Sequence, residues 1–418
     1  MQKHIAVVNG LWIGHHSIYV KTFVKVLLEA GYRVSIFCPA PDEVSSWLNE
    51  FLPVAKGSFD AHYFADREPW LWRFMPRRIQ YALGSWPRWF YASRGLRKFI
   101  PPTGKPDLVF FAWIDCYLVG YLPAKFIDWL FPYTWSGLYF HPRHLRADKK
   151  PRRGRLIVPP EEFIAQSKRA ASIAVLDEGI IEALRAGLDG KHVFALPDFS
   201  DETTPYGRSE LADQISKNAN GRKIIGLLGG LSRRKGLLTL ISIAKQSSGT
   251  DWYFVFAGRL VEETFSSDEL EEIKLFFGSH REDCFFHIEK ISSDAEFNAL
   301  VNACDVIFAM YENFPHSSNL ITKSAIYGKN VLVSTGGYME EVVTRYRLGE
   351  AVPAGSVQEA WKALYRLTSG DHMPENLAGM NEYARKQSQE KLRQIFLDLI
   401  ESSTNSLVGM GRNKACAG

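Results

Sequence analysis

The chain contains 418 residues, more than one compact domain usually holds, so two domains are expected. Its formal net charge of +4 is small and neither requires nor excludes a nucleic acid partner. The five cysteines are widely spaced without a C-x-x-C pair, which argues against a disulfide framework or a zinc site and fits a reducing compartment.

The N-terminal segment has the pattern of a strand, a glycine-containing loop, a helix and a second strand. "HIAVVNG" predicts the first strand, and no small-x-small cleavage site follows it, so we interpret it as a strand rather than a signal peptide. The loop "LWIGHHS" contains Gly14 and His15, and "IYVKTFVKVLLEAG" has helical spacing that ends at Gly31. Glycines allow a ligand to approach the backbone closely. The loop histidine either points toward a ligand or is an ordinary polar loop residue.

Residues 69–98 contain no Asp or Glu. Basic residues alternate there with aromatic ones: Arg73, Arg77, Arg78, Arg88, Arg94, Arg97 and Lys98 with Trp70, Trp72, Phe74, Trp86, Trp89, Phe90 and Tyr91. Such a mixture suits peripheral contact with an anionic membrane surface. The alternative is a helical hairpin that buries its aromatic side chains in the domain. No recognised nucleic-acid module accompanies the patch, so we expect no nucleic acid partner.

Four further strands complete the first half, one of them in "SIAVLDEG". "PDLVFFAW" and "YTWSGLYFHPR" are two of them, and His141 follows the second at its carboxyl end, where α/β proteins form their sites. The most apolar segment, 108–124, is interrupted by Asp115 and ended by Pro123, so we do not expect it to span a membrane. After the strand in "HVFALPDFSDE", residues 198–221 are polar and lack strong periodicity, which predicts a linker.

The second half opens with "RKIIGLLGGLSRRKG", a strand followed by Gly229 and Gly230 and then a basic turn. The turn contains Arg233, Arg234 and Lys235. A diphosphate needs two or more fixed cations, and each charge-assisted hydrogen bond contributes roughly 1.5–3 kcal/mol. The alternative is a solvated basic turn. A further cation, Arg259, directly follows the next strand, "WYFVFAG".

Residues 305–343 predict strand, loop, helix, strand, glycine loop and helix, the alternation of a parallel α/β sheet. Both loops end at helix N-termini, whose unpaired amides favour phosphate. The candidate binding residues in these loops are Ser317, Ser318, Asn319, Gly336, Gly337 and Glu340. Lys323 lies off the apolar face of the first helix, so it is either solvated or reaches a phosphate.

The motifs "SRRKG", "AIYGKNVLVS" and "GGYME" resemble the donor-binding region of the GT-B glycosyltransferases, family 4 (glycosyl transferases group 1). The Glu–seven–Glu motif of that family is missing, because Pro315 and Lys323 occupy its two Glu positions and Glu312 comes three residues early. The resemblance implies an α/β fold class with two Rossmann-like domains facing across a cleft. We therefore expect an acceptor domain at 1–197, the linker at 198–221, a nucleotide-sugar domain at 222–375, a helix crossing back at 376–403 and a disordered tail at 404–418.

The resemblance also implies a reaction. It implies a retaining, metal-independent transfer of a hexose from a nucleotide sugar to a glycan or lipid-linked acceptor, without a cofactor, in the cytoplasm or at the inner face of the membrane. Lys235 and Arg234 would stabilise the leaving diphosphate, and His141 is the third candidate catalytic residue. The remaining candidates would bind the donor. The alternative is an inactive GT-B protein that binds a sugar nucleotide or a partner, which the missing Glu pair favours.

Overall fold

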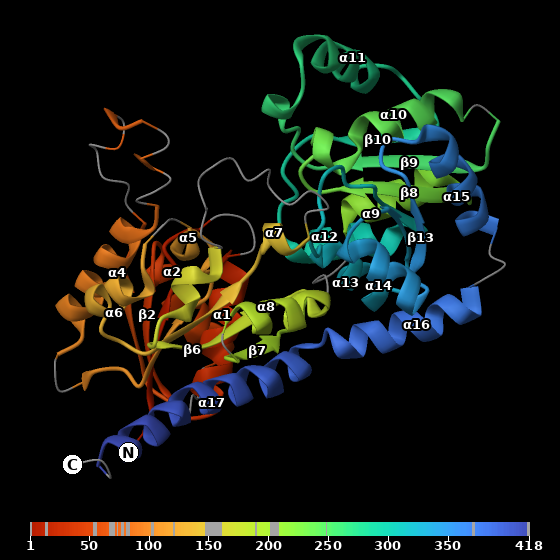
Figure 1. The fold of residues 1–418 in the computed structure, drawn as a ribbon. Coiled ribbons are helices and arrows are strands. Elements are labelled where there is room, and N and C mark those ends of the chain that lie inside the picture. The colour runs from red at the N-terminus through yellow and green to blue at the C-terminus, as the bar shows by residue number, and fades with distance from the viewer. Residues whose placement is uncertain are drawn as a thin grey trace. The chain divides into compact units, whose positions relative to one another are not determined.

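The computed structural model describes residues 2–12, 16–52, 57–66, 72, 74–76, 79–80, 84–101, 104–119, 122–146, 161–188, 190–200, 209–247, 249–369 and 373–415. These residues form two α/β units (Figure 1). One consists of Met1–Leu196 together with Leu392–Gly418, and the other of Pro197–Lys391. Each unit contains one parallel sheet with helices on its faces, so the predicted class of two Rossmann-like domains is confirmed.

The sheet of the first unit has seven strands in the order β3-β2-β1-β4-β5-β6-β7. They are β1 (His4–Val8), β2 (Arg33–Cys38), β3 (Phe59–Tyr63), β4 (Leu108–Phe111), β5 (Trp135–Tyr139), β6 (Ala170–Val175) and β7 (His192–Ala195). All neighbouring strands pair in parallel. The central strands β1, β4 and β5 are buried along their whole length, which is why they read as continuous apolar runs.

Helices cover both faces of this sheet. They are α1 (His16–Glu29), α2 (Pro41–Phe51), α4 (Trp86–Phe99), α5 (Asp115–Leu118), α6 (Ala124–Leu130), α7 (Arg143–Arg146), α8 (Ile181–Gly187) and α17 (Gln389–Ala415). Trp89 of α4 is fully buried against Phe111 and Trp135, with ring centroids 5.2 and 5.1 Å away. The buried-aromatic interpretation of 69–98 therefore holds for this residue.

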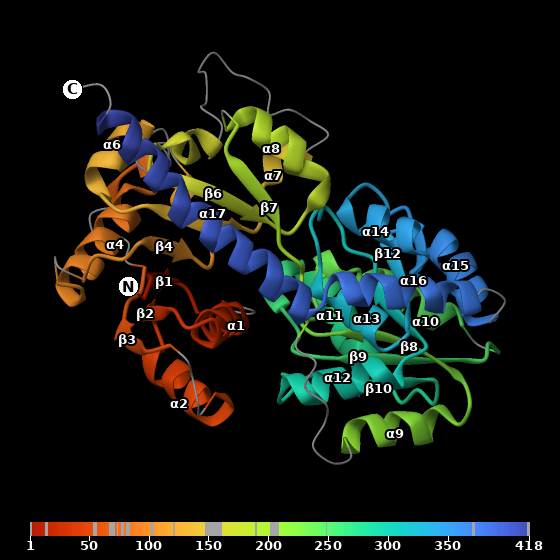
Figure 2. The same ribbon diagram turned by 90° about the horizontal axis from the view of Figure 1, so that it is seen from below.

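Helix α17 belongs to the first unit, although it lies at the far end of the sequence. Figure 2 shows α17 lying along the sheet of the first unit. Its Phe396 packs on Phe23 and Phe110, with ring centroids 4.6 and 4.8 Å away, and its Ser403 hydroxyl lies 2.7 Å from that of Ser172. The single helix predicted over 376–403 is instead two helices, α16 (Met373–Lys386) and α17. Helix α17 continues through residue 415, so the segment expected to be disordered from 404 is helical there.

The sheet of the second unit has six parallel strands in the order β10-β9-β8-β11-β12-β13. They are β8 (Lys223–Leu228), β9 (Trp252–Ala257), β10 (Cys284–His287), β11 (Val306–Ala309), β12 (Asn330–Ser334) and β13 (Gly349–Val352). Successive residues enter opposite cores, as Ile307 and Phe308 do on β11.

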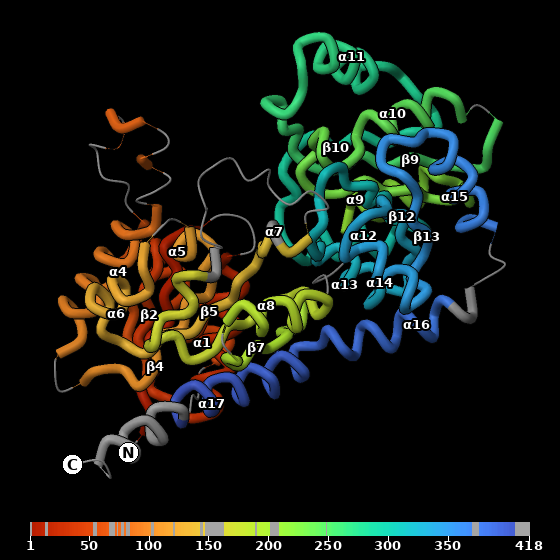
Figure 3. The backbone as a smooth tube through the Cα atoms, viewed as in Figure 1, coloured from red at the N-terminus to blue at the C-terminus, as the bar shows by residue number. Residues whose placement is uncertain are grey.

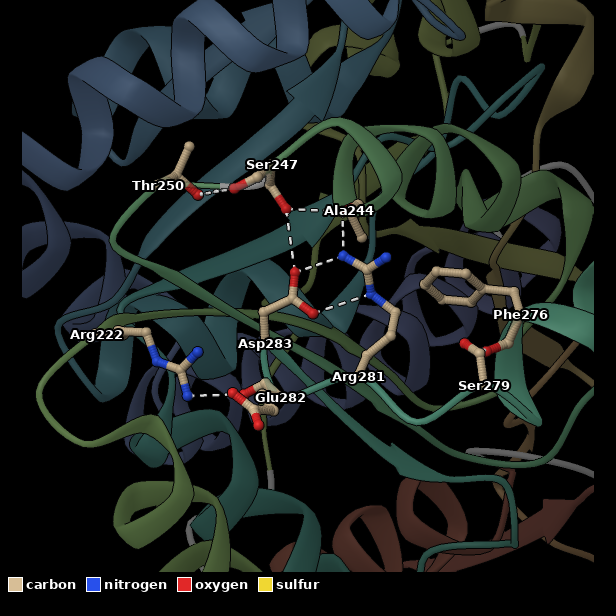
Figure 4. A network of polar contacts seen from close by, with 9 residues as sticks. All are labelled: Arg222, Ala244, Ser247, Thr250, Phe276, Ser279, Arg281, Glu282 and Asp283. Carbon is tan, nitrogen blue, oxygen red and sulfur yellow. Dashed lines mark hydrogen bonds and ion pairs between the residues drawn. The ribbon is translucent and has the colours of Figure 1, made fainter.

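The helices of the second unit connect these strands. They are α9 (Glu210–Ala219), α10 (Leu237–Gln246), α11 (Ser267–Phe277), α12 (Asp294–Ala303), α13 (Asn319–Ile326), α14 (Tyr338–Tyr346), α15 (Val357–Ser369) and α16 (Met373–Lys386). Helix α16 packs against α13 and α14 (Figure 3). Before β10, Arg281 donates hydrogen bonds to Asp283 and to the Ala244 carbonyl, which ties the entry of β10 to the end of α10 (Figure 4).

The predicted linker at 198–221 is wrong over the ten residues of α9, which lies within it. The Ser209 hydroxyl caps this helix by accepting a hydrogen bond from the Ala212 amide at 3.0 Å. Ile215 and Ala219 are each only 1% exposed and belong to the core of the second unit. The apolar residues Leu211, Ile215 and Ala219 recur every four positions along a narrow face of α9, a helical spacing that the sequence analysis overlooked among the surrounding polar residues.

Candidate functional site

Four loops meet at the carboxyl edge of the second sheet. They follow β8, β9, β11 and β12, and since the strands are parallel the loops emerge at the same edge. The loop after β8 contains Gly229, Gly230 and the basic turn 233–235, and the loop after β9 contains Gly258. The loop after β11 contains Ser317 and Ser318 and is called the serine loop, and the loop after β12 contains the second glycine pair, Gly336 and Gly337. The structure therefore brings most donor-binding candidates of the second unit to one edge.

Two glycines allow the first pair of loops to touch. Gly258 has φ +138°, and a Cβ atom there would lie 1.7 Å from the Gly229 carbonyl oxygen. Gly229 has φ +88°, and a Cβ atom there would lie 2.9 Å from Lys235 Nζ. Both positions therefore need glycine, for conformation and for space. Gly230 has no such need, since a Cβ atom there would only contact Val261 at 3.5 Å.

The three cations of the basic turn have different surroundings. Arg233 is half-exposed and forms an ion pair with Glu269. The Arg234 guanidinium lies 5.1 Å from the ring centroid of Tyr311 and 4.6 Å from that of Phe314. Lys235 Nζ donates to the Leu228 carbonyl at 3.2 Å and lies 5.7 Å from the Tyr311 ring centroid. Aromatic faces thus hold Arg234 and Lys235 without neutralising their charge.

The loop after β11 is joined to its neighbours on both sides. The Glu312 amide donates to the Arg234 carbonyl at 2.7 Å, which fixes this loop to the basic turn. On the other side the Tyr338 amide donates to the Pro315 carbonyl at 3.1 Å, and a Cβ atom on Gly337 would lie 2.8 Å from Pro315 Cα. The basic turn, the serine loop and the second glycine pair therefore form one connected surface.

Glu340 has a local partner in this surface. Its carboxylate accepts a hydrogen bond from the Gly336 amide at 2.7 Å, and Gly336 adopts φ +93°. This hydrogen bond stabilises the start of α14. A contact to a sugar remains a prediction.

The serine loop divides its side chains between two tasks. The Ser317 hydroxyl donates to the Asp198 carboxylate, and Asn319 Nδ2 donates to the Phe199 carbonyl at 2.5 Å. Both side chains therefore fasten the start of the second unit to α13. Ser318 differs, because its hydroxyl lies 3.3 Å from the Tyr311 hydroxyl and forms no capping hydrogen bond to α13. The predicted phosphate contact now rests on Ser318 and the helix amides.

Comparison with known proteins identifies this arrangement. Residues 209–387 match the family model described as glycosyl transferases group 1. The second unit belongs to glycosyl transferases group 1. No curated protein matches the sequence significantly. The recognition of this glycosyltransferase group from the motifs in the sequence is thereby confirmed.

Solved structures extend the likeness to the whole chain. HepE of Anabaena in complex with UDP-glucose is 13% identical, with a TM-score of 0.63, covering 96% of this chain and 100% of HepE. Sucrose-phosphate synthase of Thermosynechococcus elongatus is 15% identical, with a TM-score of 0.60 and full coverage of both chains. A UDP-forming trehalose-phosphate synthase of Burkholderia xenovorans is 13% identical, with a TM-score of 0.61, covering 96% and 99%. At these identities the likeness shows the fold, which is GT-B.

The group 1 domain departs from its family at Lys323, which stands where a Glu is expected. Lys323 is only 5% exposed, so the alternative of a solvated lysine is wrong. Its amine donates to Asn298 Oδ1 at 2.5 Å and lies 5.7 Å from the Phe297 ring centroid. Phe297 in turn approaches Gly229. Lys323 therefore joins α13 to α12 behind the donor loops, and a direct phosphate contact loses support.

Arg259 is the cation of the loop after β9 in the group 1 domain. It is exposed, and its side chain forms no hydrogen bond or ion pair with any residue that the structure describes. An exposed guanidinium next to Gly258 keeps its donors available for an anion. In the described parts of the chain, no group of three His, Cys, Asp or Glu side chains could hold a metal ion.

The first unit has a second polar cluster at the carboxyl edge of its own sheet. Asp115 accepts hydrogen bonds from the amides of Phe140 and His141 at 2.8 and 2.7 Å, and its carboxylate lies 3.7 Å from His141 Nδ1. Trp113 stacks between His16 and Phe140, with both ring centroids 3.9 Å away. Gly14 and His15, predicted to bind the donor, lie outside the described residues.

The sequence analysis missed the residues that support the candidates. Tyr311 and Phe314 hold the cations, and Asp115 holds the segment that contains His141. A usable signal existed for Asp115, because a carboxylate in an apolar segment is costly to bury unless it accepts hydrogen bonds. Its place after a buried strand also puts it at the edge where α/β proteins form their sites. For the two aromatic residues no local signal distinguishes a cation partner from a core residue.

Proposed function

We propose that the protein is an active glycosyltransferase that moves a hexose from a nucleotide sugar to a glycan or lipid-linked acceptor. The observation that supports this best is the cation pair Arg234 and Lys235, held on Tyr311 beside the glycine loop without a carboxylate partner among the residues that the structure describes. A cluster of this kind suits a leaving diphosphate. HepE, which shares the fold, is solved with UDP and with UDP-glucose, so a UDP-sugar is the first donor to test.

In the proposed reaction Lys235 and Arg234 stabilise the negative charge that develops on the diphosphate as the sugar leaves. Arg259 and the α13 amides with Ser318 bind the same diphosphate at rest. The cations perform the work that a metal ion performs in other transferases, so the proposed reaction is metal-independent. Retention of the anomeric configuration is the outcome that the family resemblance implies.

The proposed acceptor side is the first unit. His141 and Asp115 form a pair in which the carboxylate orients the imidazole, an arrangement suited to accepting a proton from a hydroxyl group. The stacked rings of His16, Trp113 and Phe140 offer a rigid wall beside this pair. The proposed location is the cytoplasm at the inner face of the membrane, supported by the basic and aromatic composition of 69–98.

A second candidate is an inactive GT-B protein that only binds a sugar nucleotide or a partner. It is favoured by one observation, the replacement of both family Glu positions by Pro315 and the buried Lys323. Incubation of the pure protein with a panel of nucleotide sugars separates the two functions. Slow hydrolysis of one donor supports the enzyme. Binding of a donor without turnover, even after membrane extract is added, supports the inactive protein.

A further inference from the structure

Helix α4 has a buried face and an exposed face of unusual composition. The buried face contributes Trp89 and Leu96 to the core of the first unit. On the exposed face Phe90, Arg94 and Lys98 recur every four residues and so form one stripe along the helix. The helix contains no Asp or Glu, so nothing on it neutralises this stripe. Phe90 is 38% exposed, so part of an aromatic ring on this stripe reaches water.

Helix α6 packs beside α4 (Figure 1) and also has exposed apolar side chains. Trp129 is 74% exposed, its neighbour Phe126 is 37% exposed, and Lys125 precedes them. The acid of α6, Asp128, is engaged elsewhere, because its carboxylate accepts the Ser167 hydroxyl. A large indole left in water on a helix surface is a feature of interaction sites. We call the exposed side chains of α4 and α6 the α4–α6 face.

A basic pocket of about 430 Å³ lies at the C-terminal end of α4. It is lined by Arg97, Ile100, Pro101, Lys105, Pro132 and Tyr133. Arg97 hydrogen-bonds the Tyr133 hydroxyl, and Lys105 Nζ lies 5.6 Å from the Tyr133 ring centroid. Burial and the nearby Arg169 lower the pKa of Lys105, as expected where cations gather without an acid. The lining thus combines two cations with apolar walls.

The pocket lies away from the candidate acceptor residues of the first unit. Lys105 precedes β4 and Tyr133 precedes β5, so both belong to the amino-terminal edge of the sheet. His141 follows β5 at the carboxyl edge. The pocket is therefore a separate site from the polar cluster of Asp115 and His141.

We propose that the α4–α6 face binds an anionic lipid bilayer and that the basic pocket takes the phosphate of a lipid headgroup. Exposed Trp and Phe side chains with interspersed cations match the interfacial region of such a bilayer, where aromatic rings meet negatively charged headgroups. None of the described helices is long and apolar enough to cross a membrane, so the attachment is peripheral. Nucleic acid fits less well, since the exposed rings lie on helices rather than on a sheet platform with a basic groove.

Flotation of the full chain with vesicles tests the proposal. The protein should float with mixed phosphatidylglycerol–phosphatidylcholine vesicles at low salt, remain at the bottom with pure phosphatidylcholine, and be released by high salt. Protein that remains at the bottom with the anionic vesicles at low salt overturns the proposal. Since no donor is present, this outcome is independent of the proposed glycosyltransferase activity, which the donor panel measures separately.

Three variants locate the contact. Arg94→Gln with Lys98→Gln removes two charges and should weaken partitioning roughly 25-fold, about fivefold per charge. Trp129→Ser should weaken it at least about tenfold, because the indole loses its burial in the interface. Arg97→Gln with Lys105→Gln removes the two cations of the pocket and should weaken binding to the phosphatidylglycerol vesicles by a similar factor. Matched controls on exposed positions of the second unit, Lys217→Gln and Tyr365→Ser, should change nothing.

Two competing outcomes have their own readouts. If inorganic phosphate at matched ionic strength displaces the protein from vesicles, the pocket binds free phosphate and the lipid assignment fails. If polyuridylate binds with the same sensitivity to Arg94 and Lys98 while the vesicles do not float the protein, the partner is nucleic acid.

Quenching of tryptophan fluorescence by brominated lipids that disappears in Trp129→Phe supports insertion of this ring, and quenching that is unchanged contradicts it.

Discussion

Replacement of Lys235 by methionine tests the donor site most directly. Methionine keeps the unbranched stem and removes only the amine. In the free protein that amine makes one hydrogen bond, to the Leu228 carbonyl at 3.2 Å, so the loss of folding stability should be no more than about 1.5 kcal/mol. The fold should therefore survive, and circular dichroism and the melting curve check this first.

The effect on the reaction should be much larger. One charge-assisted hydrogen bond to a diphosphate contributes roughly 1.5–3 kcal/mol, and removal of one donor from a developing anion typically costs about 100- to 1000-fold in kcat. We expect kcat/KM for donor hydrolysis and transfer to fall within that range. Most of the loss should appear in kcat, because the charge on the leaving group is greatest in the transition state.

The neighbouring Arg233 supplies a matched control. It belongs to the same turn, but its guanidinium is already paired with Glu269 and half-exposed. Arg233→Met should therefore lower kcat/KM by less than about tenfold, since this cation is screened before any donor arrives. A folded Lys235→Met protein that keeps near-normal turnover would refute the reasoning. So would an Arg233→Met protein that loses as much as Lys235→Met.

Three further predictions concern the second unit. A nucleoside diphosphate should raise the melting temperature more than its nucleoside does, because in the proposed site the cations and the α13 amides bind the phosphates, and equal stabilisation would place the phosphates elsewhere. Gly258→Ala should destabilise the protein by roughly 3 kcal/mol or more in urea unfolding, because its Cβ atom meets the Gly229 carbonyl. Gly249→Ala, with φ +86° and open space, should cost only about 1 kcal/mol, and similar losses would contradict the collision. Burial raises the pKa of Asp283, but the hydrogen bonds and charge of Arg281 outweigh burial and hold that pKa below the ordinary value of 3.8. The ion pair should therefore stabilise the protein above pH 3.8, and this stabilisation should be lost as the pH falls through the pKa of the folded state. Asp283→Asn should therefore cost roughly 1.5–3 kcal/mol at neutral pH and almost nothing in strong acid, and a pH-independent loss would exclude the ion pair as its cause.

The order of strands and loops could be read from the sequence because its signals are local. Strands buried on both faces require continuous apolar runs, as in "KIIGLL" and "DVIFAM", and the loops between them require glycine where backbones touch. The same signals predicted the carboxyl edge at which Gly229, Lys235 and Ser318 meet. They failed at α9, where only a narrow face is apolar, and at the end of α17, which packs on residues near the start of the chain.

The sequence by itself determined that this chain folds into two Rossmann-like units and that glycines and cations gather at one edge of the second, because apolar runs, glycines and a basic turn act over a few residues. Only the tertiary structure decided what each polar side chain does. Ser317 donates a hydrogen bond to Asp198, more than a hundred positions earlier in the chain. Lys323 is buried and donates to Asn298 rather than being solvated. Trp129, inconspicuous in an apolar segment, is exposed to water. Partners and exposure of this kind depend on packing between distant segments, which local sequence patterns do not contain.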